Sequence, residues 1–493
     1  MRQQRWLWAV IMGAATVGLG CADDSTPGAP GTSESTPAVA AAVTPASKAA
    51  PSKTLSPNTK FTVFTPDKDA VKQIASELKA RHLPNALKLG AMAATPQAAW
   101  FTSGTPQQVR SDVDKAMCQA DLTRTVPVLV AYDIPYRDCA QYSSGGAVDT
   151  AAYEAWIDGF AAGIGKRKAV VILEPDSLGI IPWAGDWCQP TVTDSAGNTT
   201  PAPGADPATR YLQLNYAVDK LAAAAPNALV YLDGTHSGWL NVGDASTRLA
   251  NAGVARAEGF FLNISNYQIT GNLAQYGTWI SECLAYGTSV TPGDFGSCPN
   301  QYWNGGPLPS LIAQINGEWN GTALDGNGAW SDTSTTVALN TSGINLRYAN
   351  MLGATTPTAR FIIDTSRNGH GPLNGAQYAA APYDQPSDVQ AKLTSGNWCN
   401  PPGAGLGLRP TANTGVAQLD AYLWVKIPGE SDGSCDIAGG PRAWDYTQYN
   451  PWGLTGDAQN HFDMLWGIVD PAAGLWFPQQ ALQLAQNAVP PLL

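Results

Sequence analysis

Short apolar runs alternate with helical patterns along the chain from about residue 58 onward. Six runs, several of them rich in β-branched residues, cover 128–133, 169–174, 228–233, 260–265, 360–364 and 421–426. Helix-compatible stretches cover 151–164, 207–224, 344–352 and 479–488. Continuous apolar strands that alternate with helices are typical of a parallel sheet covered on both faces. Six or more such units favour a barrel over an open sheet, a choice that periodicity alone leaves open.

Each apolar run ends in a polar cluster. The clusters are Asp133 to Asp138, Glu174 with Asp176, Asp233 with His236, Asn263 with Asn266, Asp364 with Arg367, and Lys426 to Asp432. Loops are polar in general, but ordinary loops would mix in Ser, Lys and Gly instead of placing carboxylates at five of six ends. Parallel barrels build their active sites at the C-terminal ends of the strands. The pattern therefore predicts an assembled site at that end.

The first 57 residues predict export and a tether. Arg2 and Arg5 precede an apolar run that ends at residue 20 and is too short to span a membrane comfortably, so 1–20 is expected to be a signal peptide. Cys21 follows a small residue there, which resembles a bacterial lipoprotein cleavage site. Ordinary cleavage nearby is the alternative. Residues 21–57, rich in Ala, Pro, Ser and Thr, are expected to be a disordered linker.

A single catalytic domain is expected over 58–493, with insertions at 268–342 and 436–474. Insertions of this length usually form lids or walls of a binding site. Export also permits disulfides. Setting Cys21 aside for lipid leaves seven cysteines, an odd number, so Cys118 is expected as a buried free thiol. The plausible local pairs are Cys139 with Cys188, Cys283 with Cys298, and Cys399 with Cys435, although sequence does not fix this connectivity.

Composition narrows the class of protein. Charged residues make up 14% of the 493 residues, which suits a secreted enzyme with a polar, uncharged surface, and the net charge of −11 argues against a nucleic-acid partner. The 17 Trp and 17 Tyr can stack on sugar rings or simply fill a large core. Four His without a closely spaced ligand motif make catalytic zinc unexpected, although Asp clusters also bind Ca²⁺. No cofactor and no metal is expected.

Two carboxyl groups suffice to hydrolyse an acetal. One protonates the leaving oxygen, and the other activates water or attacks the anomeric carbon. The acid needs a raised pKa, which burial or a neighbouring carboxylate supplies. Asp138 and Asp176 each follow a predicted strand and are well placed to form such a pair.

Seven blocks along the chain resemble the motifs of glycoside hydrolase family 6, in the family's order. Among them are YDIPYRDC at 132–139, LEPDSL at 173–178 and WVKIPGESDG at 424–433. The others cover 232–239, 263–267, 364–369 and 397–400. Any one block is a weak signal, but seven in order leave little room for chance. The resemblance implies a distorted (β/α) barrel of about seven parallel strands and inverting hydrolysis of β-1,4-glucan.

The resemblance also implies roles for individual residues. Asp176 would be the general acid, Asp138 would keep the pKa of that acid raised, and Asp432 would match the proposed base. A salt bridge with Lys426 or Arg367, or ligand binding, is the alternative for Asp432. Tyr132 would press on the distorted sugar and Ser144 would hold water. The implied substrate-binding residues are Asp233, His236, Trp239, Asn266, Trp398, Lys426 and Glu430.

The resemblance leaves the cut position open. The family's cellobiohydrolases enclose the site with a long loop after the match to Asp432, whereas here Cys435 follows Gly433 after one residue, as in an open endoglucanase cleft. The two insertions and the ending at 484–492 favour a cellobiohydrolase instead. The family's disulfides correspond to Cys139–Cys188 and Cys399–Cys435. A non-catalytic glucan-binding protein is the alternative of a different class, and the pair Asp138 and Asp176 counts against it.

The implied partner is a β-1,4-glucan, with contact to a membrane only through lipid at Cys21. The protein is expected to act as a monomer.

Overall fold

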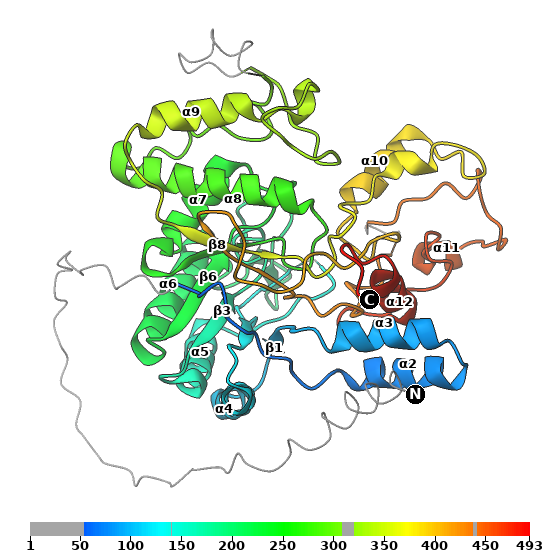
Figure 1. Cartoon of the computed structure of the whole chain (residues 1–493), viewed down its shortest axis with the longest axis horizontal. Helices are drawn as coiled ribbons and strands as arrows, with labels where there is room; N and C mark the ends of the chain where they lie inside the picture. Colours follow the sequence, from blue (N-terminus) through cyan, green and yellow to red (C-terminus); the bar gives the residue numbers. More distant parts are fainter. Residues whose placement is uncertain (1–53, 140, 308–319, 437–440) are drawn as a thin grey trace. The chain divides into compact units, whose positions relative to one another are not determined.

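The computed structural model describes residues 54–139, 141–307, 320–436 and 441–493 (Figure 1). The predicted signal peptide at 1–20, the lipid at Cys21 and most of the predicted linker at 21–57 lie outside the described residues. Leu55, at the end of that expected linker, is buried in the apolar cluster that lines the inner face of the sheet. Residues 54–493 form one compact unit.

The described residues contain a sheet of seven parallel strands, ordered along the sheet as they are along the chain. The strands are β1 (Ala99–Phe101), β2 (Val128–Ala131), β3 (Ala169–Leu173), β6 (Ala228–Asp233), β7 (Gly259–Leu262), β8 (Arg360–Asp364) and β9 (Leu419–Leu423). Across the gap between the two edge strands, the Ala98 N–H donates to Trp424 O at 3.0 Å and the Trp100 indole donates to Val425 O at 2.9 Å. The sheet therefore curls into a distorted barrel, as expected.

Side chains along each strand alternate between two apolar clusters. In β3, Val170 and Ile172 join the cluster inside the barrel, whereas Ala169, Val171 and Leu173 join the cluster under the helices. Both faces are buried, which is why these strands are continuous apolar runs in the sequence.

Helices follow the strands and cover the outer face of the sheet (Figure 1). These are α4 (Pro106–Thr123), α5 (Thr150–Ile164), α6 (Pro207–Ala224), α7 (Val242–Asn251), α8 (Thr270–Ala285) and α9 (Ser342–Leu352). Their starts follow N-cap chemistry: Thr105 forms a capping box with Gln108, and Asp149, Asp206 and Asn241 each accept a backbone N–H of the first turn.

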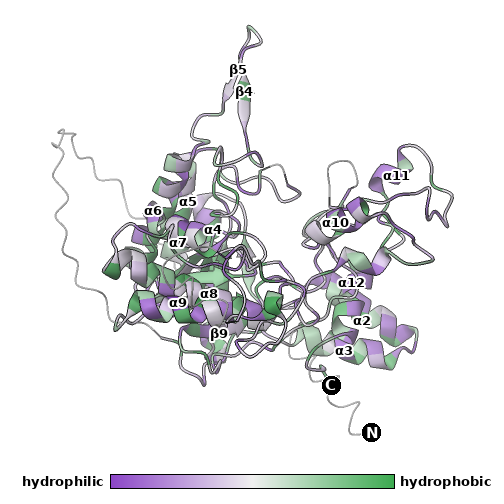
Figure 2. Ribbon diagram, turned by 90° about the horizontal axis from the view of Figure 1, so that it is seen from above, coloured by the Kyte–Doolittle hydropathy of each residue, from purple (hydrophilic) through white to green (hydrophobic). Residues whose placement is uncertain are grey.

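A second group of helices packs side by side: α2 (Lys68–Lys79), α3 (Leu83–Ala93) and α12 (Pro478–Gln486) (Figure 2). The two ends of the described chain therefore lie in contact. The short helices α10 (Ser387–Ser395) and α11 (Ala458–His461) lie beyond them, and β4 (Thr191–Thr193) and β5 (Thr199–Pro201) form an exposed hairpin. The remaining turns are η1 (Val254–Arg256), η2 (Tyr286–Val290), η4 (Val337–Leu339) and η5 (Gly375–Tyr378). No described helix is long and apolar enough to cross a membrane.

Several element boundaries differ from the expectation. The predicted strands at 128–133 and 421–426 run past the real ends of β2 and β9, because their polar last residues belong to the loops of the site. Strand β1 was not among the predicted runs. The expected insertion at 268–342 begins with α8, a regular helix of the barrel layer, so the irregular part begins only after residue 285.

The three local disulfides are confirmed: Cys139–Cys188, Cys283–Cys298 and Cys399–Cys435. The prediction of a free thiol at Cys118 is wrong, because this cysteine is disulfide-bonded. That prediction followed from setting Cys21 aside for lipid attachment, which left an odd number of cysteines to pair.

Candidate active site

The polar clusters predicted from the strand ends meet at the C-terminal end of the barrel. Sharp turns after the strands place them there: Asp138, Asp176 and Thr235 all have left-handed backbone conformations, with φ of 49°, 63° and 57°. Such a conformation costs energy for a non-glycine residue and is typical of functional sites. These turns follow β2, β3 and β6, so they bring their loops to the same end of the barrel.

Asp176 has the most strongly perturbed acidity of these carboxyl groups. Burial raises its pKa well above the usual range, and the negative charges of Asp138, Asp233 and Asp432 raise it further. The same four carboxyl groups are therefore close enough to interact, as the strand-end pattern predicted. A carboxyl group in this environment keeps its proton at neutral pH. That is the state a general acid needs.

Asp138 lies on the loop after β2. Its Oδ2 accepts the backbone N–H of Ser143 at 3.1 Å. Burial raises the pKa of Asp138 to about 6, while that hydrogen bond and the charge of Arg137 oppose the rise. Asp138 is thus the more acidic member of the pair with Asp176.

Arg137 holds this loop against the barrel. Its guanidinium donates to Tyr132 O, to Thr102 O at 2.8 Å and to Ser143 O at 3.2 Å, and it stacks over the Tyr132 ring at 4.6 Å. Tyr132 is buried, and its pKa is raised by burial and by the charges of Asp138 and Asp176, which places its ring beside both carboxyl groups. Ser144 is exposed, and the hydrogen bond to Asp138 comes from its neighbour Ser143 instead.

Asp432 is held by a bidentate ion pair with Arg367. The guanidinium donates to Oδ2 at 3.0 Å and to Oδ1 at 2.8 Å, and the Arg367 side chain is fully buried. The hydroxyl of Tyr267 and the N–H of Asn400 also donate to Oδ2, at 3.0 and 2.9 Å. The salt bridge with Arg367, one alternative for Asp432, is therefore present. Lys426 lies 3.8 Å from Glu430 instead.

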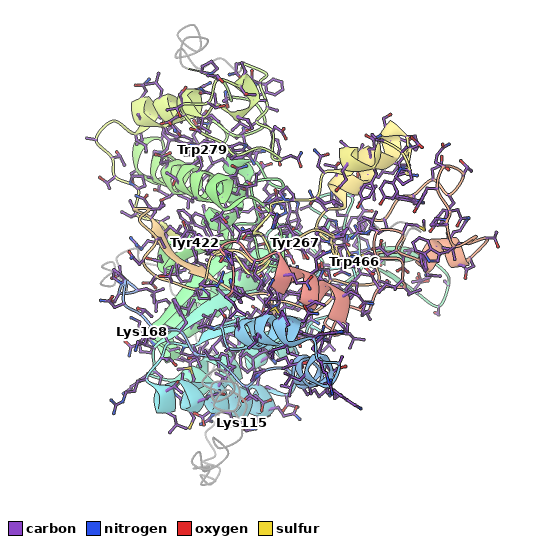
Figure 3. All side chains as sticks on the ribbon, turned by 45° about the vertical axis from the view of Figure 1, so that its right-hand side comes forward. Lys115, Lys168, Tyr267, Trp279, Tyr422 and Trp466 are labelled. Atoms are coloured by element: carbon purple, nitrogen blue, oxygen red, sulfur yellow. A yellow bond between two sulfur atoms is a disulfide. The ribbon has the colours of Figure 1, made fainter. Side chains whose placement is uncertain are left out.

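Asn400 ties Asp432 to a second pair of buried carboxyl groups. Its amide accepts the Asp432 N–H at 2.9 Å and donates to Asp470 Oδ2 at 2.9 Å. Burial, together with the neighbouring Asp463, raises the pKa of Asp470 to about 8. Tyr267 and Trp466, both labelled in Figure 3, also belong to this network: the Tyr267 hydroxyl donates to Asp432, and the Trp466 indole donates to Asn400 O at 2.6 Å.

Asp233 binds the loop that carries Asp176. Its Oδ2 accepts the N–H groups of Leu178 and Gly179 at 3.1 and 3.2 Å, and its Oδ1 accepts that of Thr235 at 2.8 Å. Burial raises the pKa of Asp233 to about 6. Asp233 was expected to bind substrate, and its hydrogen bonds show that it also positions the Asp176 loop.

Glu174, at the end of the neighbouring strand, positions a loop in the same way. It is fully buried, and its carboxyl group accepts the N–H groups of Asp133 and Ile134 at 3.0 Å. Burial raises its pKa to about 8. The sequence places Glu174 in a strand-end cluster and in a motif but predicts no role for it, although a Glu that ends a continuous apolar run is a signal of a buried functional carboxyl group.

The predicted sugar-stacking residues flank the carboxyl groups. The Trp239 ring lies 5.7 Å from that of His236 and packs so closely on Gly179 that a Cβ there would meet it at 2.4 Å. Burial lowers the pKa of His236 to about 4, so its ring is neutral. The ring of Trp398 lies 6.1 Å from that of Tyr142, and both Trp239 and Trp398 are half-buried.

Two further predicted binding residues lie at the edges of the site. Asn266 is half-buried, and its Oδ1 is buried without a partner among the described residues. Burial raises the pKa of the half-buried Glu430. Within the described ranges, no cluster of three or more His, Cys, Asp or Glu could hold a metal ion.

A distorted parallel barrel that holds a buried carboxyl group of raised pKa among three others fits a glycosidase of the two-carboxylate type. Comparison with known proteins makes the assignment specific. Residues 57–488 match the family described as Glycosyl hydrolases family 6, so the chain belongs to glycosyl hydrolase family 6, as its motifs indicated.

Curated relatives include both kinds of enzyme named above. Endoglucanase A of Thermobispora bispora is 28% identical over 401 residues, which cover 81% of this chain and 57% of the relative. Endoglucanase 1 of Streptomyces halstedii is 31% identical over 356 residues, covering 72% and 76%. A probable 1,4-beta-D-glucan cellobiohydrolase C of Aspergillus terreus is 29% identical over 384 residues, covering 73% and 59%. The chain thus spans little more than half of some of these relatives.

Among solved structures, the endoglucanase Cel6 of Mycobacterium tuberculosis, in complex with a thio-linked cellobioside, is 28% identical with a TM-score of 0.53. The match covers 87% of this chain and 97% of that structure. It supports the distorted barrel seen here.

Proposed function

We propose that this protein hydrolyses β-1,4-glucosidic bonds in cellulose or a related β-glucan, with inversion at the anomeric carbon. The observation that carries the proposal is the raised pKa of Asp176, which burial and three neighbouring carboxylates produce at the C-terminal end of the barrel. The relatives named endoglucanase and cellobiohydrolase indicate the substrate class.

In this mechanism Asp176 donates its proton to the glycosidic oxygen as the bond from that oxygen to the anomeric carbon breaks. A water molecule attacks the anomeric carbon from the opposite face, and its proton passes to a carboxylate that acts as base. The charged carboxylate of Asp138 keeps the pKa of Asp176 high until transfer. A buried site of low dielectric strengthens this effect.

Asp432 is the proposed base. Its Oδ2 accepts three hydrogen bonds, from Arg367, Tyr267 and Asn400, whereas its Oδ1 accepts one, from Arg367. Oδ1 is therefore the oxygen with a lone pair to accept the water's proton, directly or through a second water. The ion pair fixes the orientation of this oxygen.

The remaining predicted residues are proposed to bind the sugar. Trp239 and Trp398 would stack on glucosyl rings on either side of the carboxyl groups, and the rigid Tyr132 ring would press on the distorted one. Ser144 would hold water, and Asp233 would contribute through the Asp176 loop. The other proposed contacts are His236, Asn266, Lys426 and Glu430.

We propose that the protein cuts internally. Only one residue separates Gly433 from Cys435, which leaves no room for a long enclosing loop between them. Release of cellobiose is the second candidate, because the segments at 286–341 and 436–474 supply extra chain and because cellobiohydrolases are among the relatives.

One incubation tests these proposals. Purified protein is mixed with carboxymethylcellulose, and viscosity is followed alongside reducing ends. A steep fall in viscosity with few new ends supports internal cutting, and a slow fall with accumulating cellobiose supports the second candidate. Proton NMR of the first product should show the α-anomer. An early β-anomer would overturn the inverting mechanism, and a lack of new ends would overturn hydrolysis altogether.

The remaining proposals concern the N-terminal residues. We propose export through the signal peptide at 1–20, a flexible linker at 21–53, and a monomeric enzyme. Lipid on the Cys21 sulfur is not proposed, because Cys118 is disulfide-bonded and the three local pairs leave Cys21 as its one possible partner in a monomer. Mass spectrometry of the N-terminal peptide, from protein expressed with its own leader in a bacterium, tests this proposal. A lipidated peptide that contains Cys21 would overturn it.

A further inference from the structure

A segment after the Cys283–Cys298 disulfide packs on the loop that carries Trp239. The side chain of Gln301 donates to Ser237 O at 3.1 Å and to Leu240 O at 2.9 Å. The Tyr302 hydroxyl donates to Trp239 O at 3.1 Å. The segment therefore lies directly beside a proposed sugar-stacking residue, although it belongs to none of the family motifs.

The protein holds this segment rigidly. Gln301 and Asn304 are buried, with 1% and 0% of their surface exposed, and Tyr348 donates its hydroxyl to Pro299 O at 2.7 Å. The disulfide fixes Cys298 just before it. A rigid surface loses little entropy when a ligand binds to it.

Two aromatic rings of this segment remain open to solvent. Tyr302 is 40% exposed and Trp303 is 47% exposed. Together with Asn241 and Asn300 they line an open pocket of about 480 Å³. This volume lies in the range of small-molecule sites.

The chemistry of the pocket fits a sugar. The apolar face of a pyranose packs on flat aromatic rings, while its hydroxyl groups bond with amides such as those of Asn241 and Asn300. Among the described residues, no charged side chain lines the pocket, so an ionic ligand would gain nothing from them. A neutral, ring-shaped, hydroxyl-rich ligand is the best match.

We propose that Tyr302 and Trp303 form an additional glucan-binding subsite, which continues the path of the substrate chain beyond Trp239. This inference rests on the proposed function, because the occupant is a distant glucosyl unit of the same chain that is cut. The subsite lies outside the residues that sequence reasoning assigned to the substrate, and the segment that builds it falls within the expected wall at 268–342.

The test compares kcat/KM on cello-oligosaccharides from cellotriose to cellohexaose. Trp303→Ala should lower kcat/KM on the longest substrate roughly tenfold more than on the shortest, because only a long chain reaches the pocket. Trp303→Phe, which keeps an aromatic ring, should retain most of the preference of the unmodified protein for long substrates, measured as kcat/KM. Leu212→Ala is the control, since Leu212 is 67% exposed and lies on α6, in the helix layer outside the barrel.

Two outcomes overturn the subsite. One is a loss for Trp303→Ala that is equal on short and long substrates. The other is a similar length-dependent loss for Leu212→Ala. If the unmodified protein hydrolyses none of these oligosaccharides and no polymeric glucan, the proposed function itself fails, and the subsite fails with it. Activity of the unmodified protein therefore separates the two failures.

Discussion

Asp176 and Asp432 face the same site, but the protein surrounds them in opposite ways. Other carboxylates surround Asp176, and its loop is held through backbone N–H groups that bond Asp233. Asp432 instead has a buried guanidinium, a tyrosine hydroxyl and a backbone N–H around it. Burial among other carboxyl groups thus disfavours the charged form of Asp176, whereas Asp432 has a cation as its partner. Local charge, not residue type, supports the opposite roles proposed for them.

Replacing Asp176, the proposed acid, tests the part of this comparison that concerns this residue and should have the largest effect. Asp176→Ala is expected to lower turnover on an unactivated glucan by roughly 10²–10⁴-fold, because no other group supplies the proton. Binding of cello-oligosaccharides, measured by calorimetry, should persist. Near-normal turnover on such a substrate would show that Asp176 is not the acid.

Replacing Arg367 tests the part of this comparison that concerns Asp432. Arg367→Ala leaves Asp432 buried without its partner, which should cost about 3–5 kcal/mol in the free energy of unfolding measured with urea. The control is Arg256→Ala, because Arg256 pairs with Asp219 at an exposed site and should cost at most about 1 kcal/mol. Equal costs for the two variants would mean that the Asp432 ion pair contributes no more than a surface pair.

The Asp233→Asn variant tests whether the charge of Asp233 raises the pKa of Asp176. With the amide oxygen in the Oδ2 position, the N–H groups of Leu178 and Gly179 keep their acceptor, but the NH2 group replaces the oxygen that accepts the Thr235 N–H. The negative charge that raises the pKa of Asp176 is gone. The pKa of Asp176 should fall, so the alkaline limb of the kcat–pH profile should move to lower pH. Asp219→Asn, at an exposed position, should leave the limb unmoved. If the alkaline limb of Asp233→Asn does not move, the charge of Asp233 does not contribute to the raised pKa of Asp176.

Asp470→Asn tests the network behind Asp432 and should have the smallest effect. The pKa of Asp470 is raised from 3.8 to about 8, so its contribution to stability is present at low pH and is lost as pH rises through about 8. The variant carries no such group. Between pH 7 and pH 9 the unmodified protein should therefore lose roughly 1–2 kcal/mol more unfolding free energy than the variant. Parallel stability curves for the two proteins would contradict the raised pKa.

The amino-acid sequence determined a large share of this protein by itself. Buried strands and capped helices are local patterns, so six of the seven strands of the parallel sheet and helices such as Pro207–Ala224 can be predicted from the sequence. The order of the motifs determined the family, and the strand-end carboxylates located the site. Strand β1 is not predicted because its three residues carry too little pattern. Helix α8 is not predicted as part of the barrel because it lies within the expected insertion at 268–342.

Only the tertiary structure decided the partner of each side chain. Whether Asp432 meets Arg367 or Lys426, and whether Tyr302 lies beside Trp239, depends on contacts between residues about 60 positions apart. The proton on Asp176 depends on the burial and charge that four separate loops create together. Such effects arise from distances in space, and no local pattern in the chain encodes them.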